Sequence, residues 1–185
     1  MRSIARAAAV LSMGLFAATS SHGQPETWAR SRASLVAGVS EVAFPGTPGA
    51  IVVSGLSAFA VVPAGAGGKG NLAPLIAASE FGKGRIIVFG HTGFLESGSL
   101  ATADQRTFFG NAVAWCGRAA SPRVAVHGLR SLRSALEKWP EAPIRLVTAN
   151  EPGVLSNLNG VDVLCLGQGA LKPAEIAAVR AFVEQ

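Results

Sequence analysis

The stretch RVAVHGLRSLRSALEKW, residues 123–139, decides the fold class. Its first five residues, 123–127, are rich in β-formers, and Gly128 interrupts the run. The apolar residues that follow recur at helical spacing, and they are Leu129, Leu132, Leu136 and Trp139. The stretch therefore predicts a β-strand followed by an amphipathic helix.

The same alternation continues toward the C-terminus. We expect strands at 144–148 and 161–166, a loop or short helix between them, and a helix that starts at Pro173. That last helix is expected to bury Ile176, Val179, Phe182 and Val183. Near-continuous apolar strands separated by such helices predict a parallel sheet covered on both faces. A helix with an apolar face should be followed by another strand of the same sheet. We therefore expect this unit, residues 122–185, to be incomplete and the chain to continue in a longer protein.

The preceding part, residues 24–118, contains several short runs of β-forming residues. Residues 75–81 and 85–89 flank Gly82-Lys83-Gly84 and predict a hairpin. Residues 50–54 and 58–62 are two further short β-rich runs, and their spacing predicts an antiparallel pair. Residues 24–34 are either a linker or a first short helix. The overall expectation is an α/β fold, a β-rich N-terminal segment joined at residues 119–122 to an incomplete parallel β/α unit.

A well-marked helix closes the β-rich segment. Thr102 and Gln105 form the pattern of a capping box, and Gly117 marks the end. One face is apolar at helical spacing, and it comprises Phe108, Phe109, Ala112, Val113 and Cys116.

The first 23 residues have the order of a secretory signal peptide. Arg2 and Arg6 precede an apolar run, residues 7–19, which is shorter than the roughly 20 residues that a membrane span needs. Small polar residues then predict cleavage between Gly23 and Gln24. We expect a secreted or periplasmic protein with no stable membrane span after the leader is removed.

Composition excludes several classes. Hydrophobic residues are 49% and charged residues 15%, the opposite of an intrinsically unfolded chain. Loss of Arg2 and Arg6 with the leader lowers the formal net charge from +5 to +3. The remaining cations form no basic stripe interleaved with aromatic residues, so no nucleic-acid partner is expected. The Gly-rich run 65–70 lacks the Ser or Thr that a phosphate loop places after its lysine, and no cofactor is expected.

Two stretches resemble known families. GKGRIIVFGHTGFL (residues 82–95), with the later FFGNAVAW (108–115), resembles the N-terminal region of TRP-channel-associated factors and their bacterial relatives. Longer members of that group carry an enhancin-like metallopeptidase domain. VDVLCLGQGALKPAEIAAVRAFVEQ (161–185) resembles a unit of class I glutamine-amidotransferase-like, flavodoxin-like domains.

The resemblance implies fold more than activity. The peptidase chemistry of the longer relatives needs an HExxH pair, and the chain has only His22, His91 and His127. The amidotransferase nucleophile would lie beyond Gln185. Cys165 sits inside an apolar strand, where we expect it to be buried, and Cys116 is interpreted in the same way. Export would permit a disulfide between these two cysteines, although nothing in the sequence shows them to be close.

Polar side chains near strand ends are the best site candidates. His91 follows one strand in a loop that holds Glu96, and His127 ends another. Together with Glu96 or Asp104, the two histidines have the chemistry to ligate zinc or to act as acid and base. The alternative is that His91 hydrogen-bonds and shapes its own loop. No metal is assigned.

A second set of candidates lies at the carboxyl edge of the predicted parallel sheet. Asn150, Glu151 and Gln168 follow strands there, and with His127 they would form a polar ligand cleft. The alternative is ordinary turn chemistry at residues 150–153.

The sequence thus favours a secreted, non-catalytic recognition or scaffold region of a larger protein, with a protein or glycan as ligand and a downstream domain in the same chain. The rival hypothesis is a small hydrolase or amidotransferase-like enzyme that uses His91 or His127. A third is that the region has no autonomous role.

Overall fold

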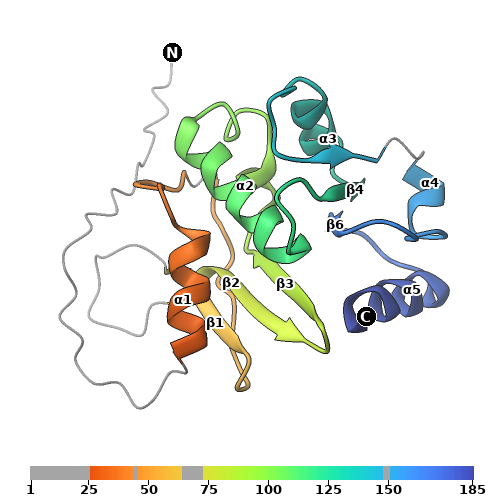
Figure 1. The fold of residues 1–185 in the computed structure, drawn as a ribbon, viewed down its shortest axis with the longest axis horizontal. Coiled ribbons are helices and arrows are strands. Elements are labelled where there is room, and N and C mark those ends of the chain that lie inside the picture. The colour runs from red at the N-terminus through yellow and green to blue at the C-terminus, as the bar shows by residue number, and fades with distance from the viewer. Residues whose placement is uncertain (1–25, 44–45, 64–72, 148–150) are drawn as a thin grey trace.

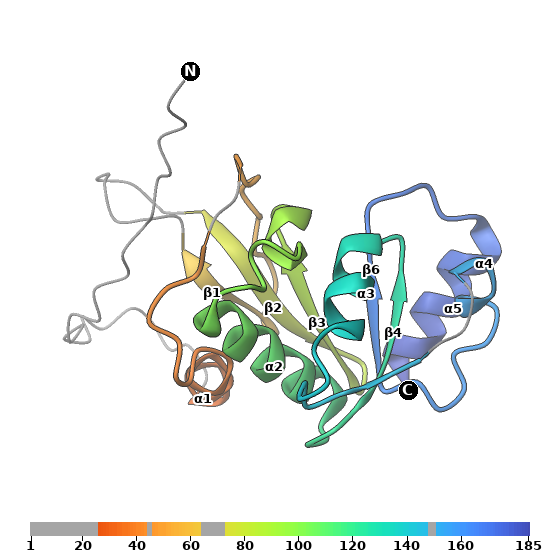
Figure 2. The same ribbon diagram turned by 90° about the horizontal axis from the view of Figure 1, so that it is seen from above.

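Two three-stranded sheets of opposite character form the framework. The computed structural model describes residues 26–43, 46–63, 73–147 and 151–185. Sheet A is antiparallel and sheet B is parallel, as the sequence predicts for the two halves of the chain (Figures 1 and 2). The strands of sheet A are β1 (Ala58–Pro63), β2 (Pro74–Phe81) and β3 (Gly84–Phe89), and those of sheet B are β4 (Arg123–His127), β5 (Arg145–Leu146) and β6 (Val163–Leu166).

The predicted hairpin is confirmed as β2 and β3. Phe81 pairs with Gly84, so Gly82 and Lys83 make the turn. Gly82 has a φ of +61°, a backbone conformation that costs glycine little because it lacks a Cβ. β2 is the central strand of sheet A, and its first five residues are buried.

The expected antiparallel pair of residues 50–54 with 58–62 is wrong. Residues 50–54 form no strand, and β1 pairs with β2 instead. Val52 is 90% exposed, so the short apolar run has no buried face to hold it in a sheet. A single backbone hydrogen bond, from Ile51 N to Pro74 O at 2.9 Å, ties the run to the start of β2.

Helix α1 (Glu26–Leu35) confirms the helical alternative for the segment at residues 24–34. It packs on sheet A through Trp28, whose ring stacks on Phe59 with centroids 6.2 Å apart. Leu35 at its end is fully buried in the core.

Helix α2 (Ala103–Gly117) begins where the sequence predicts. Thr102 Oγ1 accepts a hydrogen bond from Gln105 N at 3.3 Å. In a capping box the Gln105 side chain would also accept a hydrogen bond from Thr102 N. Here the Gln105 side chain has another partner, because its Nε2 donates to Phe94 O at 2.9 Å. Phe94 belongs to a short 3-10 helix, η1 (Thr92–Leu95), which the sequence analysis placed in a loop. The predicted apolar face of α2 is buried, apart from Cys116, which is half-buried.

Sheet B has the order β5-β4-β6, with both neighbours parallel to β4. Helix α3 (Arg130–Glu137) buries Leu132 and Leu136 as predicted, and α4 (Glu151–Val154) is the short helix expected between β5 and β6. β5 has only two residues, fewer than the expected 144–148, of which residue 148 lies outside the described part.

Helix α5 (Pro173–Glu184) starts at Pro173 as predicted, but its expected burial is wrong. None of its residues is buried, and Ile176 is 54% exposed. The reason is its position, since it contacts β3 and its apolar face borders a cavity. Periodicity identified that face correctly without indicating what it packs on.

One continuous core joins both sheets. Buried side chains from the two halves of the chain belong to a single cluster, with Phe94 and Phe108 from one half and Val124 and Leu132 from the other. The predicted division at residues 119–122 falls in the connection between α2 and β4, and it stays a prediction.

Some sequence predictions fall on residues outside the described part. These are the signal peptide at 1–23, the Gly-rich run at 65–70 and Asn150. Within the described residues, none of the helices has the length and apolar character needed to traverse a bilayer.

The packing around residue 117 should require glycine, because it leaves no room for a side chain. A Cβ at this position would lie 2.7 Å from Pro122 Cβ and 3.0 Å from Val163 Cγ2. We expect Gly117→Ala to destabilise the protein by about 1–3 kcal/mol through this overlap, measured by urea unfolding. Gly98→Ala is the matched control, because its Cβ would meet nothing within 4 Å, and its effect should stay within about 0.5 kcal/mol. Equal effects of the two substitutions would contradict the packing argument.

Candidate functional site

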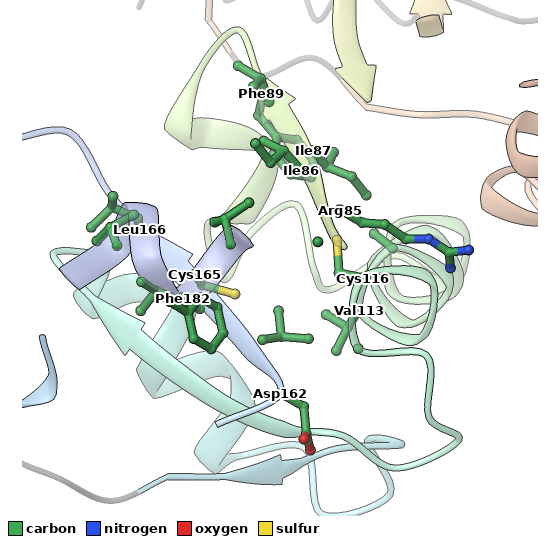
Figure 3. Close-up of a pocket in the computed structure, with 18 of the residues that line it drawn as sticks. Arg85, Ile86, Ile87, Phe89, Val113, Cys116, Asp162, Cys165, Leu166 and Phe182 are labelled. Carbon is green, nitrogen blue, oxygen red and sulfur yellow. The ribbon is translucent and has the colours of Figure 1, made fainter. Parts of the chain in front are cut away.

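A large cavity lies between sheets A and B. Its volume is about 710 Å³, within the range typical of ligand sites. β3 and β6 form two of its sides, and α2 and α5 contribute further apolar side chains (Figure 3). The walls are mostly aliphatic and aromatic, with polar groups at the margins.

His91 lines this cavity and also caps η1. Its Nδ1 accepts a hydrogen bond from Gly93 N at 2.9 Å. The ring packs beside Gly46, where a Cβ would come within 3.5 Å of His91 Cε1. This geometry agrees with the alternative in which His91 shapes its own loop.

Glu96 and Asp104 do not line the cavity that contains His91. Glu96 is exposed and lines a second cavity of about 420 Å³, together with Gly128 and the start of α3. The Asp104 carboxylate accepts hydrogen bonds from the backbone N–H groups of Ser40 and Glu41, at 2.9 and 2.8 Å. It therefore holds the segment that follows α1. Among the side chains that the structure describes, no three of His, Cys, Asp or Glu are grouped as a metal site requires.

The ends of β4 and β6 do lie side by side. His127 O accepts a hydrogen bond from Gly167 N at 2.8 Å. Gln168, which follows, is exposed at the margin of the large cavity. Glu151 is the first residue of α4, and its predecessor Asn150 lies outside the described residues. The polar cleft of these residues stays a prediction.

The structure brings together two residues that the sequence could not pair. Cys116 on α2 and Cys165 on β6 line the same cavity, and Figure 3 shows both side chains at its walls. Both are free and half-buried, so Cys165 faces a cavity where the sequence predicts burial inside the sheet. Burial raises the pKa of each thiol from 9.0 to about 12. Arg85 opposes the rise at Cys116, whereas Cys116 itself adds to the rise at Cys165. Both thiols are therefore protonated at neutral pH, and a thiol is a poor nucleophile.

Arg85 is the residue at this site that sequence reasoning missed. Its guanidinium donates to Trp115 O at 2.7 Å and lies 4.8 Å from the centroid of the Trp115 ring. Arg85 Nε is also 3.3 Å from Glu80 Oε1. The side chain thus ties β3 to the last turns of α2. The only available signal was the Arg in the GKGR stretch, and that gave no indication of its partner.

Comparison with known families gives one match. The family model TCAF_N, described as the TRPM8 N-terminal domain, matches residues 17–151. This span holds all of sheet A, α2, β4, α3 and β5. No curated protein and no solved structure matches the chain. The channel-associated-factor part of the resemblance is thereby confirmed.

The raised thiol pKa values predict a pH dependence of stability. The unfolded thiols lose their protons near their ordinary pKa of 9.0, while the folded ones keep theirs to about 12. Stability should therefore fall as the pH rises above about 9. We expect the free energy of unfolding in urea, measured under reducing conditions from pH 7 to 10, to fall more steeply for the native chain than for Cys116→Ala/Cys165→Ala. The chain contains no tyrosine to obscure the comparison. Parallel pH profiles of the native chain and the double variant would contradict the raised pKa values of the two thiols.

The capping role of His91 can be separated from a catalytic one. His91→Ala removes the acceptor for Gly93 N and should cost about 1 kcal/mol of stability. Asparagine offers a side-chain oxygen as a cap, so His91→Asn should restore most of that loss. Urea unfolding of the three proteins is the measurement. An alanine variant as stable as the native chain would count against the capping role.

Proposed function

The chain belongs to the TCAF_N family, and from this premise we propose that it is a recognition or scaffold region of an exported, channel-associated-factor-like protein. It acts by binding and performs no catalysis. The observation that carries the proposal is the family match from residue 17 to residue 151. The description of that family as an N-terminal domain of TRPM8 supports association with other proteins as its role.

The cavity supports a protein partner over a glycan. Most of its lining is aliphatic, with Ile86, Val88, Leu164 and Val179 among the residues that border it. Glycan recognition depends on arrays of polar groups, whereas the centres of protein interfaces are apolar. We therefore place protein first and keep glycan as the second candidate.

The chemistry of the polar residues supports a non-catalytic role. The two thiols are held protonated by burial, and His91 Nδ1 already accepts a hydrogen bond from Gly93 N. The alternative function, a small hydrolase or amidotransferase-like enzyme using His91 or His127, needs an activated nucleophile beside a histidine base. The described residues offer no nucleophile with a lowered pKa in the cavity.

The strand order supports the finer fold assignment. Taken in chain order, β4, β5 and β6 are arranged 2-1-3, the first part of the flavodoxin-like order 2-1-3-4-5. We propose on this ground that residues 122–185 form a flavodoxin-like, class I glutamine-amidotransferase-like unit. An enhancin-like peptidase domain, as in the longer relatives, is the proposed downstream neighbour.

Export belongs to the same proposal. It is supported by the composition of residues 1–23, with two arginines before an apolar run and small residues before Gln24. The mature protein then starts at Gln24 and acts outside the cytoplasm.

Binding by the exported protein is the decisive experiment. The full-length chain with a C-terminal tag is expressed, and the purified product should have Gln24 as its N-terminal residue. We expect this protein to retain a partner protein from a cell-envelope extract and to bind it again when both are purified. The control is a tagged protein of similar size and charge from the same compartment.

Three results would contradict the proposal. A cooperatively folded chain that binds nothing above background, in the extract or on a glycan array, has no recognition role. Turnover of a substrate that His91→Ala or His127→Ala abolishes, while the variant still unfolds cooperatively, assigns the rival enzyme. Product that retains residues 1–23 in the cytoplasm contradicts export.

A further inference from the structure

The large cavity runs along the edges of two strands. All six residues of β3 and all four residues of β6 line it. Successive side chains of a strand point to opposite faces of the sheet. A cavity that lay against one face would contact only every second residue. Contact with every residue therefore indicates that the cavity borders the hydrogen-bonding edge of each strand.

Each of these edges has a backbone partner on one side only among the described residues. β3 pairs with β2, and β6 pairs with β4. Gly90 N donates to Leu75 O, which makes the neighbouring pair of Phe89 with Ile76 a non-hydrogen-bonded one. The N–H and C=O groups of Arg85, Ile87 and Phe89 consequently point away from β2. Along β6, likewise, every second peptide group points away from β4.

Two helices also border the cavity. On one side lies the face of α2 that carries Phe109, Ala112, Val113 and Cys116. On the other side lies the face of α5 that carries Val179, Phe182 and Val183. These α5 side chains belong to a helix without any buried residue. The cavity is thus bordered by both strands and by the apolar faces of both helices (Figure 3).

Three of the charged side chains that line the cavity are already engaged. The Arg85 guanidinium is held by Trp115, and Arg118 donates to Lys83 O at 2.8 Å. The Asp162 carboxylate accepts a backbone hydrogen bond, at 2.7 Å, from the first residue of β4. These three groups offer no unpaired charge to an occupant, and the remaining charged side chain of the lining, Lys83, is exposed in the hairpin turn. An occupant needs apolar side chains for the two helices and peptide groups for the two edges.

We infer that this cavity is the acceptor site for one extended, uncharged strand that a partner polypeptide supplies. The strand pairs with β3 on one side and with β6 on the other, which joins sheets A and B into one sheet. β3 spans about 20 Å and β6 about 13 Å at the usual rise per residue, so four to six residues fill the gap, the ordinary length of a strand. A lipid chain of the same volume would leave the peptide groups of both edges without partners. The inference rests on the proposed function and specifies the chemistry of the partner.

Synthetic peptides test the inference on the full-length chain. The probes are acetylated peptides with a core of about six valine, isoleucine, leucine or alanine residues between lysines. Cys116 and Cys165 report occupancy, because both line the cavity. A bound strand should slow their alkylation by iodoacetamide, by about 100-fold when the peptide is present at 100 times its Kd. A matched peptide with proline at the centre of its core should give no protection.

N-methylation separates strand pairing from simple apolar binding. Two versions of the best peptide carry methyl groups on alternate amides, so each version loses the N–H donors that face one edge. Each should bind roughly tenfold more weakly or worse, since two or three hydrogen bonds are lost. If either version protects the cysteines as well as the parent peptide, pairing on both sides is excluded and the inference fails. It fails also if no peptide protects them.

A cavity-filling variant provides the control on the protein side. Cys165→Phe should block peptide binding, detected through Cys116, whereas Val52→Phe on an exposed segment should leave it unchanged. Undiminished binding by Cys165→Phe overturns the inference. Protection that grows with protein concentration in the absence of peptide assigns the cavity to a second copy of the chain, which also overturns it. A purified partner that binds both variants equally leaves the proposed function standing and removes only the strand site.

Discussion

Helix α2 is the element on which both sheets depend. Its apolar face packs on sheet A, where Phe108 meets Phe89 edge to face with ring centroids 6.2 Å apart. Its last residue, Gly117, lies against Pro122 and Val163 at the start of sheet B. A side chain at this position would hold the helix away from β6. The absence of a Cβ at one residue therefore sets the distance between the two halves of the molecule, and with it the width of the cavity between them.

Features of the fold with a local cause were predictable from the sequence. The Gly82 turn, the Thr102 cap and the β/α alternation after residue 122 each depend on residues close together in the chain. The errors concern partners distant in the sequence. Residues 50–54 have the composition of a strand, but β1 finds its neighbour in β2 because β2 offers buried positions and the shorter run does not. For α5, periodicity located the apolar face but carried no information on whether another element covers it.

The candidate site was predictable only in part, for the same reason. Strand-end reasoning correctly expects His127 to lie beside the end of β6, as the hydrogen bond between His127 O and Gly167 N shows. It could not divide the polar residues between two cavities, with His91 and Gln168 at the larger and Glu96 at the smaller. Nor could it find that Cys116 and Cys165 share a cavity, since that proximity follows from the packing of α2 against β6.

A single physical property, the apolar character of the cavity walls, accounts for both sides of the functional argument. Burial that raises the thiol pKa values to about 12 makes Cys116 and Cys165 ineffective nucleophiles at neutral pH. The same apolar surroundings raise the cost of leaving the peptide groups of β3 and β6 without partners. A reacting substrate would need charge stabilisation that these walls do not offer, because Arg85 and Asp162 are engaged elsewhere. A neutral strand needs only apolar contact and backbone hydrogen bonds, and the cavity supplies both.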